Sequence, residues 1–555
     1  MSLNSNSRFA MNPTSLGNIP RTQFDLSNNI KTSFNVGDIV PFDVMEVLPG
    51  DTFNVETNIL CRMQTLAAPI MDDIYLDTFY FFVPNRLVWS HWAEFCGENK
   101  QSSWIPTTAY EIPQIQFDEE NPNGSIFDYM GIPTNVKGFS VNSLPYRAYK
   151  LIWNEWFRDQ NLQDPLLVDV GDGTEIFGTD GTVDATLLKA GKYHDYFTSC
   201  LPSPQKGPDV TIPMIGGGEF PVYSVTNKYI PSELQGRDMR LKLNTTAISN
   251  DALNLSIKHY GDSDTSRYTM GVISGDTKSV TTQAVYGVSP INLWSSVDGL
   301  PVATINQLRL AFATQKLYEK DARGGSRYIE ILKSHFGVTS PDARLQRPEL
   351  LSYNHISVQV QQIVQNSETA TTPLGTTAAM SLTANSNGSF LKSFVEHGYV
   401  LGLAVARYKH TYQQGLNRLW SRKNRFDFYW PVFSNIGEQP VLNKEIYLAT
   451  DGATSNDEVF GYQEAWADYR YRPDRTSGEM RSSHATSLDV WHLGDDYASM
   501  PYLSAEWIQE DKTNVDRVLT VTSEVSNQLF MDILVKNIAT RPMPMYSIPA
   551  LSSYL

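Results

Sequence analysis

The segment from Phe34 to Trp89 constrains the fold most, because it reads as several β-strands in succession with no helical segment between them. Within it, Phe53 to Ile59 alternates apolar and polar residues, which is the period of a half-buried strand. The run from Ile74 to Val83 is apolar on both faces and carries five aromatic residues. A strand of that kind needs cover on both sides, so the segment predicts a two-sheet sandwich.

The rest of the chain interrupts this β pattern with helices and then resumes it. Apolar residues at spacings of three and four predict helices over 144–160, 304–320 and 328–336. After Arg347-Pro348 the strand pattern returns, and strands are predicted at 356–360, 399–406, 426–433, 518–522 and 528–535. Strands at both ends with helices between them predict a mainly β sandwich with long, helix-containing loops.

Composition divides the chain into an arm, a body and an insertion. Residues 1–33 are polar and rich in Asn and Ser, and we expect an N-terminal arm that is disordered or held only by its neighbours. Residues 34–204 and 291–555 form the body. Between 205 and 290, Trp is absent while Gly, Ser, Thr, Asn and Asp are abundant. This stretch is too long and too strand-like for a linker, so we expect an exposed β-rich insertion that protrudes from the surface.

Charge and cysteine content limit the classes of function. The net charge of −16 argues against a chain that wraps nucleic acid by itself, although local basic patches remain compatible with it. Three cysteines without paired spacing are expected to be free thiols. The N-terminus has no apolar signal segment, and the chain has no run long enough to span a membrane. These features favour synthesis in a reducing cytosol.

No catalytic or metal-binding pattern emerges from the sequence. The nine histidines are scattered, and none pairs with a second ligand at zinc-binding spacing. The glycines at 171–178 lack the Lys-Ser/Thr of a phosphate-binding loop and are interpreted as turns. Acidic clusters such as Asp118-Glu119-Glu120 are interpreted as acidic turns. We therefore expect no catalytic residues, no metal and no cofactor.

One basic and aromatic segment stands out. From His397 to Phe426 there is no Asp or Glu, whereas six basic residues alternate with five aromatic residues. Basic groups beside aromatic rings suit single-stranded DNA, with phosphates on the cations and bases on the rings. The candidate contacts are Arg418, Trp420, Arg422, Lys423 and Arg425. The alternative is that these arginines pair with acidic neighbours in a subunit interface, where Arg, Tyr and Trp are enriched.

Four blocks of this sequence carry a resemblance to a known family. They are VGDIVPF…EVLPGDTF…APIMDDIYLDTFYFFVPNRLVW near the N-terminus, LPYRAYKLIWNEWFRDQNLQDPL at 144–166, QKLYEKDARGGSRYIEILKSHFGV at 315–338 and ARYKHTYQQGLNRLWSRK at 406–423. Their content and order resemble the major capsid proteins of gokushoviruses, which are single-stranded-DNA bacteriophages of the Microviridae. The resemblance covers most of the chain except roughly residues 205–290.

The resemblance implies a structural protein rather than an enzyme. It implies an eight-stranded antiparallel jelly roll, a T=1 icosahedral shell around a circular single-stranded DNA genome, and an insertion that protrudes around the three-fold axes. The implied partners are further copies of the chain, a small basic DNA-packaging protein, a pilot protein, an internal scaffolding protein and the packaged DNA. The implied location is the virion capsid, assembled in the bacterial host cytoplasm. The alternative class is a polysaccharide-binding or polysaccharide-degrading β-sandwich, because acidic, aromatic-rich sandwiches bind sugars.

The insertion is the expected site of host contact. Loops on a rigid scaffold tolerate change and carry recognition, and this stretch combines many turn-forming residues with a break in composition. The residues proposed to meet a receptor on the bacterial cell surface are Asp262, Asp264, Arg267 and Tyr268. A spacer or a contact around the three-fold axis is the alternative role for this stretch.

Overall fold

The computed structural model describes most of the chain as two compact units. The described residues are 20–99, 109–179, 181, 183–210, 305–368, 373–375, 377–450 and 454–546, with the backbone alone of four short strands between 219 and 296. The first unit comprises residues 1–208 and 317–555, and the second comprises residues 209–316.

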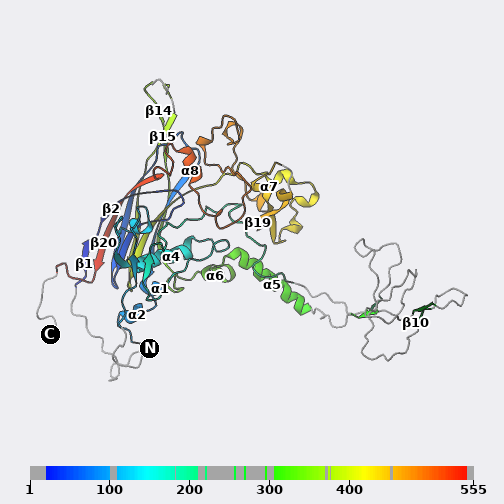
Figure 1. Cartoon of the computed structure of the whole chain (residues 1–555), viewed down its shortest axis with the longest axis horizontal. Coiled ribbons are helices and arrows are strands. Elements are labelled where there is room, and N and C mark those ends of the chain that lie inside the picture. Colours follow the sequence, from blue (N-terminus) through cyan, green and yellow to red (C-terminus); the bar gives the residue numbers. More distant parts are fainter. Residues whose placement is uncertain are drawn as a thin grey trace. The chain divides into compact units, whose positions relative to one another are not determined.

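Two antiparallel sheets form the centre of the first unit (Figure 1). Sheet one has the order β1-β20-β4-β16, and β2 also pairs with β20. Its strands are β1 (Thr22–Asp25), β2 (Asn28–Phe34), β4 (Thr52–Met63), β16 (Thr383–Ser393) and β20 (Leu529–Arg541). Sheet two has the order β13-β5-β17-β3. Its strands are β3 (Val40–Val47), β5 (Ile74–Pro84), β13 (Glu349–Ser357) and β17 (Gly398–Tyr408).

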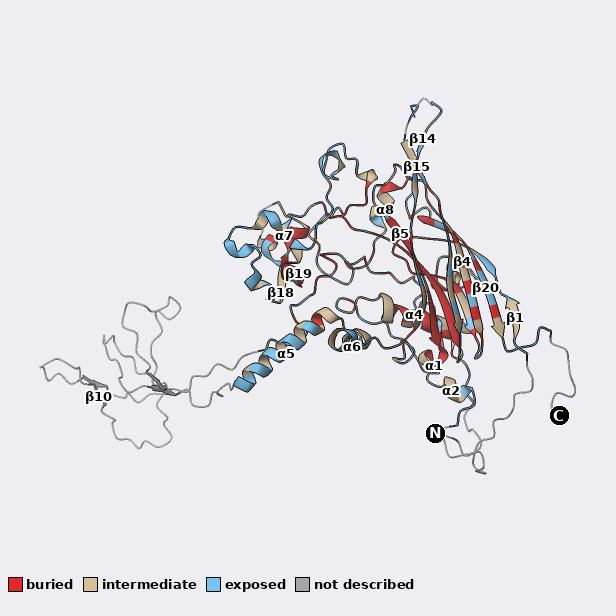
Figure 2. Cartoon of the chain, turned by 180° about the vertical axis from the view of Figure 1, so that it is seen from behind, coloured by how far each residue is buried: buried red, intermediate tan, exposed pale blue. Residues whose placement is uncertain are grey.

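The burial of these strands follows their sequence pattern. In β4 and β20, buried and more exposed residues alternate, so each strand turns one face to the core and the other away from it. In β5 and β17 nearly every residue is buried. Figure 2 shows β5 as a mostly red strand. The prediction of a strand covered on both faces is therefore confirmed.

The two faces of sheet two contribute to different apolar cores. Tyr80 and Val400 belong to the core shared with sheet one, which also includes Phe53 and Ile533. Phe81 and Leu401, one residue further along their strands, point the other way and pack with Trp89 and other residues of the helical layer. Sheet two thus lies between sheet one and the helical segments.

The helical layer is built from segments inserted between strands. Its helices are α1 (Asn85–Val88), α2 (Trp92–Phe95), α3 (Ile126–Tyr129) and α4 (Leu144–Ile152), the last continuing as a π-helical turn (Trp153–Phe157). A small sheet of order β7-β6-β8 lies in the same segment, with β6 (Gln114–Phe117), β7 (Phe139–Asn142) and β8 (Glu175–Phe177). The aromatic residues of these segments explain why the loops of the sandwich are themselves well packed.

A third apolar cluster combines residues near 196–200, such as Phe197, with residues of the elaborated loops after β17, such as Tyr412 and Phe460. The elements in this and the remaining loops are α6 (Tyr328–Phe336), β14 (Val360–Val364), β15 (Thr377–Ser381), β18 (Glu438–Leu442), α7 (Asn443–Ile446), β19 (Val459–Glu464) and α8 (Thr513–Val518). Short 3-10 turns occupy Arg418–Ser421, Arg425–Asp427, Pro431–Phe433, Thr454–Asp457, Ala467–Tyr469, Gly478–Met480 and Asp489–Trp491.

Two of the predicted strands are wrong, and the N-terminal arm ends earlier in the chain than predicted. Residues 426–433 form 3-10 turns, because the Asp427 carboxylate accepts the backbone N–H groups of Lys423 and Asn424 and Pro431 cannot donate to a strand ladder. Val518 is the last residue of α8, and residues 519–522 follow the helix rather than forming a strand. The N-terminal arm was expected to reach residue 33, but residues 22–25 and 28–34 already pair with β20, so sheet one begins at Thr22.

The second unit contains two pairs of short antiparallel strands. Strand β9 (Glu219–Pro221) pairs with β12 (Trp294–Ser296), and β10 (Leu255–Ile257) pairs with β11 (Tyr268–Met270). Helix α5 (Ile305–Gly324) begins in this unit and continues into the first. The second unit thus runs from 209 to 316, and the insertion predicted at 205–290 stays a prediction.

Gly402 provides a test of packing between the strands of sheet two. A Cβ atom at this position would lie 2.8 Å from Phe42 Cζ and 3.0 Å from Tyr80 Cε1, and both rings are buried. We expect Gly402→Ala to cost about 1–3 kcal/mol of unfolding free energy, since an overpacked core must shift its rings. Gly388→Ala in β16 is the matched control, because its Cβ would meet no atom within 4 Å. Equal melting temperatures for the two variants would contradict the prediction.

Candidate assembly and nucleic-acid surface

Much of the basic and aromatic segment 397–426 is internal to the first unit. Tyr399 and Tyr408 lie in β17 and are buried, and Asn142 and Asn514 donate hydrogen bonds of 2.8 and 3.0 Å to their hydroxyls. Tyr412 is also buried, and its hydroxyl donates to Asp195 at 2.7 Å. These rings belong to the core, so the interleaved pattern of the sequence is not one continuous binding surface.

Two of the five candidate DNA-contacting residues already have acidic partners. The Arg418 guanidinium lies 3.5 Å from the Glu445 carboxylate and donates to the Pro440 carbonyl at 3.1 Å. Arg422 forms an ion pair with Asp468, and its guanidinium lies 4.1 Å from the centroid of the Tyr469 ring. The charges of Arg418 and Arg422 are therefore balanced within the chain, by Glu445 and Asp468.

The other three candidates lie on the surface. Trp420 is 75% exposed, and Lys423 and Arg425 are also exposed. Arg425 lies 5.3 Å from the Phe426 ring centroid and 5.8 Å from that of Trp430. A cation among exposed aromatic rings is thus present at this point, although the segment contributes fewer available charges than its composition suggests.

These residues belong to a larger exposed apolar region, which we call the 419–436 surface. Its exposed apolar residues are Leu419, Trp420, Phe426, Phe428, Tyr429, Trp430, Val432 and Ile436. Surface patches of this kind mark sites of interaction with other macromolecules. Only part of it was anticipated from the sequence, although the density of aromatic residues in FDFYWPVF was a usable signal.

Internal hydrogen bonds hold the 419–436 surface in place. The Trp430 indole donates to the Arg425 carbonyl at 2.8 Å, and the Trp466 indole donates to the Phe433 carbonyl at 2.8 Å. Hydrogen bonds from the backbone N–H groups of Asn424 and Lys423 lower the pKa of the exposed Asp427 carboxyl. The exposed rings are therefore presented by a structured loop, which reduces the entropy lost on binding.

A buried ion triad is centred on His410, which precedes this surface in the chain. His410 Nδ1 is 3.0 Å from Asp495 Oδ1, and its Nε2 is 3.0 Å from Glu510 Oε1. Burial alone lowers the pKa of His410, but the charges of the two carboxylates outweigh it and raise the pKa to about 10. Both ring nitrogens consequently act as donors. In the sequence the histidines are scattered, and nothing in their spacing predicts that His410 lies between two carboxylates.

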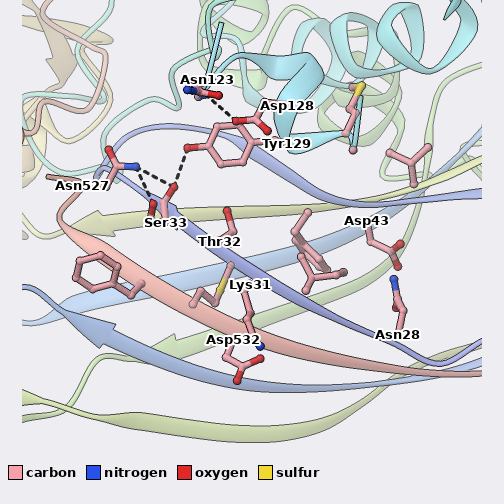
Figure 3. A pocket seen from close by; sticks show the side chains of 18 of the residues that line it. Asn28, Lys31, Thr32, Ser33, Asp43, Asn123, Asp128, Tyr129, Asn527 and Asp532 are labelled. Atoms are coloured by element: carbon pink, nitrogen blue, oxygen red, sulfur yellow. Dashed lines mark hydrogen bonds between the residues drawn. The ribbon is translucent and has the colours of Figure 1, made fainter. Parts of the chain in front are cut away.

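A polar cleft of about 1050 Å³ opens between β2, β3, β20 and residues 123–131 (Figure 3). Tyr129 donates to the Ser33 carbonyl at 2.7 Å, and Asn527 donates to the same carbonyl at 3.1 Å. Burial raises the pKa of Asp43, at the other side of the cleft, to about 7. The residues that line this cleft include no histidine and no cysteine.

The remaining site predictions concern the second unit. Asp262, Asp264 and Arg267 lie outside the described residues. Tyr268 begins β11, for which only the backbone is described. Within the described part of the chain, no group of three or more His, Cys, Asp or Glu side chains is arranged to hold a metal ion. No helix in that part is long and apolar enough to cross a bilayer.

Comparison with known proteins identifies the family. A family model described as "Capsid protein (F protein)" matches residues 13–551. The chain belongs to the capsid protein (F protein) family. Membership of this family confirms the relationship that the four sequence blocks indicated, and the β-sandwich with its helical loops agrees with a capsid protein.

Three bacteriophage relatives in the family carry the same description. Capsid protein VP1 of Bdellovibrio phage phiMH2K is 42% identical over 541 residues, which cover 96% of this chain and 95% of the relative. Capsid protein VP1 of Spiroplasma virus 4 is 41% identical, with 96% of each chain covered. Capsid protein VP1 of Chlamydia phage 1 is 39% identical, with 98% of this chain and 97% of the relative covered.

Membership in the F protein family decides the class of function. The chain is a structural protein of the virion capsid, and copies of it assemble into a shell. The relatives are Microviridae phages. The family therefore decides against the alternative of a sandwich that binds or degrades polysaccharide, and the protein is not an enzyme.

Proposed function

We propose that this chain is the major capsid subunit of a T=1 icosahedral shell that encloses a circular single-stranded DNA genome. The 419–436 surface carries the proposal, because a structured loop exposes eight large apolar residues that one subunit leaves uncovered. Closed symmetric assembly buries such a surface without leaving open ends. Assembly takes place in the cytoplasm of the bacterial host.

Within this proposal the sandwich is an eight-stranded jelly roll. Sheet one contributes β2, β20, β4 and β16, sheet two contributes β3, β17, β5 and β13, and β1 extends the edge occupied by β2. The chain passes from one sheet to the other at β2 to β3, β3 to β4 and β4 to β5. This alternation supports the jelly roll, which is an architecture used in viral shells.

The proposed partners follow from the charge of the chain. A shell of subunits that each carry a net charge of −16 needs help to neutralise its genome. A small basic DNA-packaging protein supplies that charge in this proposal. A pilot protein and an internal scaffolding protein complete the set of expected partners.

Electron microscopy of native particles tests the shell directly. We expect uniform closed particles whose mass corresponds to 60 copies, the number that defines a T=1 shell, together with a single-stranded genome. Analytical ultracentrifugation that finds only monomers or dimers in native material would contradict the proposal. Particles of another triangulation number would reject the T=1 assignment and leave the capsid role intact.

The apolar part of the 419–436 surface is expected to serve assembly. Trp430→Ala combined with Val432→Ser should lower the yield of shells at least tenfold, because central aromatic contacts contribute about 2 kcal/mol or more to an interface. Val432 is 87% exposed, so its replacement should affect the free subunit little. Trp430→Ala also removes the hydrogen bond to the Arg425 carbonyl, so circular dichroism of the free subunit checks that the fold is retained. Val525→Ser, at a residue 80% exposed, is the control. Normal shell yield from the double variant would show that this surface is not a subunit contact.

Trp420, Lys423 and Arg425 remain available to a strand of packaged DNA. We expect Lys423→Gln combined with Arg425→Gln to leave shells intact but reduce genome retention, and more so as salt is raised, because phosphate contacts are electrostatic. Arg418 and Arg422 are excluded from this test because each has an acidic partner in the chain. Loss of the shells themselves at every salt concentration would assign these residues to a subunit interface instead.

The insertion is the proposed host-contacting element. Replacing residues 261–280, which include Asp262, Asp264, Arg267 and Tyr268, should reduce adsorption to the host more than it reduces particle yield. Adsorption is measured by depletion of particles from a mixture with host cells. A collapse in yield with normal adsorption of the surviving particles would replace the recognition role with a structural one.

A further inference from the structure

A second cavity, of about 350 Å³, lies on the face of sheet two that points away from sheet one. Residues of β5, β13 and β17 form its floor, and the π-helical turn after α4, the loop at 191–194 and the start of α6 form its sides. All of these residues belong to the first unit. The cavity is separate from the 419–436 surface and from the polar cleft, and its volume suits a ligand the size of one nucleotide.

The charges around this cavity are unlike those of the chain as a whole. Its lining includes four basic side chains and one carboxylate: Arg158, Lys192, Arg327, Arg407 and Asp159. Arg407 is balanced by Asp77 at 2.5 Å, and Arg327 by Glu330 at 3.2 Å. With these two pairs set aside, Arg158 and Lys192 face the single carboxylate of Asp159, so the lining keeps a small excess of positive charge, which favours an anionic ligand.

Two of these arginines, Arg158 and Arg327, interact electrostatically and are incompletely hydrogen-bonded. Arg327 Nη2 donates to the Arg158 carbonyl at 2.9 Å, and Arg158 Nη1 donates to the Gln163 carbonyl at 2.6 Å. The Nε atoms of both arginines are buried without a hydrogen-bond partner among the described residues. Burial and the nearby Arg327 charge lower the pKa of Arg158. An anionic oxygen at these two guanidinium groups would offset the repulsion between them.

Aromatic rings line the same cavity. Tyr353 stacks on Phe79 with a centroid distance of 4.9 Å and an interplanar angle of 25°, and Phe157 meets Phe79 edge-on at 5.2 Å. Tyr353 is nevertheless 49% exposed, so part of its ring remains available to a ligand. A planar base can stack on such a ring, and this contact does not depend on base identity.

We propose that this cavity binds one nucleotide, with its phosphate at Arg158 and Arg327 and its base against Tyr353. The packaged single-stranded DNA is the source of the nucleotide under the proposed function, and a free nucleotide presents the same chemistry. The combination of paired guanidinium groups and an exposed ring distinguishes this site from a site for phosphate alone. No step of covalent chemistry is involved.

Equilibrium binding to the full-chain subunit tests the site with three probes, inorganic phosphate, thymidine monophosphate and a labelled oligothymidylate of five residues. We expect Tyr353→Leu to weaken binding of the two nucleotide probes roughly tenfold, whereas Tyr353→Phe retains the ring and binds within about twofold of the unmodified chain. We expect Arg158→Gln to weaken all three probes. Tyr502→Leu and Arg470→Gln, at exposed positions outside the cavity, are the matched controls.

Each outcome decides for or against the site. Binding unaffected by Tyr353→Leu, or nucleotides bound no better than inorganic phosphate, would overturn it. Because Arg158→Gln can also disturb the turn that it stabilises, photo-crosslinking of bromodeoxyuridine-labelled genome in intact virions gives an independent measurement. Crosslinks at 153–158 or 350–355 support the packaged strand as ligand, and crosslinks confined to other segments reject it. Shells of normal appearance with a failed nucleotide test would overturn this site while leaving the proposed capsid function intact.

Discussion

Shells assembled from subunits with His410→Gln are expected to melt at a clearly lower temperature than unmodified shells. His410 is almost fully buried between Asp495 and Glu510, and glutamine removes the positive charge that both carboxylates face. Breaking a buried ion pair by removing one partner costs about 3–5 kcal/mol, since the other charge stays buried without compensation. Near-ultraviolet circular dichroism during heating measures the loss of tertiary structure. His484→Gln is the control, because His484 is exposed and its ring is hydrogen-bonded to nearby Thr486 rather than to a carboxylate.

The same triad sets a pH window for stability. The pKa of His410 is raised from 6.5 to about 10, so its contribution is complete below pH 6.5 and is lost as the pH rises through 10. Burial raises the pKa of Asp495, but His410 outweighs burial and lowers it to about 2, so this contribution is complete above pH 3.8 and lost as the pH falls through 2. Melting temperatures should therefore fall in the alkaline range in unmodified shells and change less there in the His410→Gln variant. Parallel pH profiles for the two would contradict the assignment.

Arg147→Met is expected to have a comparable effect on the fold. Arg147 in α4 is 1% exposed, its Nε donates to Glu175 at 2.7 Å, and its Nη1 donates to the carbonyls of Val88 and Gly171 at 3.2 and 3.0 Å. Methionine preserves much of the volume but leaves the Glu175 carboxylate buried and unpaired, at a cost of about 3–5 kcal/mol. The yield of folded subunit and its melting temperature measure the loss.

A second substitution at Glu175 separates charge from packing in this test. In the double variant Arg147→Met, Glu175→Leu no charge remains to be buried, so much of the lost stability should return. Arg470→Met is the single-site control, because Arg470 pairs with Glu464 at a largely exposed position. If the double variant is no more stable than Arg147→Met, the hydrogen bonds to the two carbonyls account for the effect instead.

The sequence predicted the sandwich well wherever a strand has one buried face or two. The alternation in β4 and the doubly apolar run in β5 follow directly from side-chain direction in a strand, which depends on the strand alone. The segment 426–433 was misread because its aromatic density resembles a strand. Its turns depend on Asp427 and Pro431, whose local hydrogen bonding competes with a ladder. The part of the insertion around 239–243 that was also interpreted as strand-like lies outside the described residues.

The candidate sites were less predictable because their partners are distant in sequence. The basic residues between 418 and 425 were identified, but Asp468 lies 46 residues beyond Arg422 and nothing local indicates that they meet. His410 similarly meets Glu510, 100 residues away. The cavity near Arg158 combines residues from 79 to 508, so its composition is visible only once the chain is folded. Local pattern predicts strands, whereas charge pairing depends on the tertiary structure.

The position of β20 has a consequence for the timing of folding during synthesis. Asn28 in β2 pairs with Val535, a separation of 507 residues, and β1 likewise has β20 as its partner. The same strand also pairs with β4, so sheet one is divided until residues 529–541 have left the ribosome. At roughly 5–20 residues per second, the N-terminal strands wait about half a minute or longer for their partner. A nascent or truncated subunit that lacks β20 therefore cannot complete sheet one. The complete sheet forms only after nearly the whole chain has been translated.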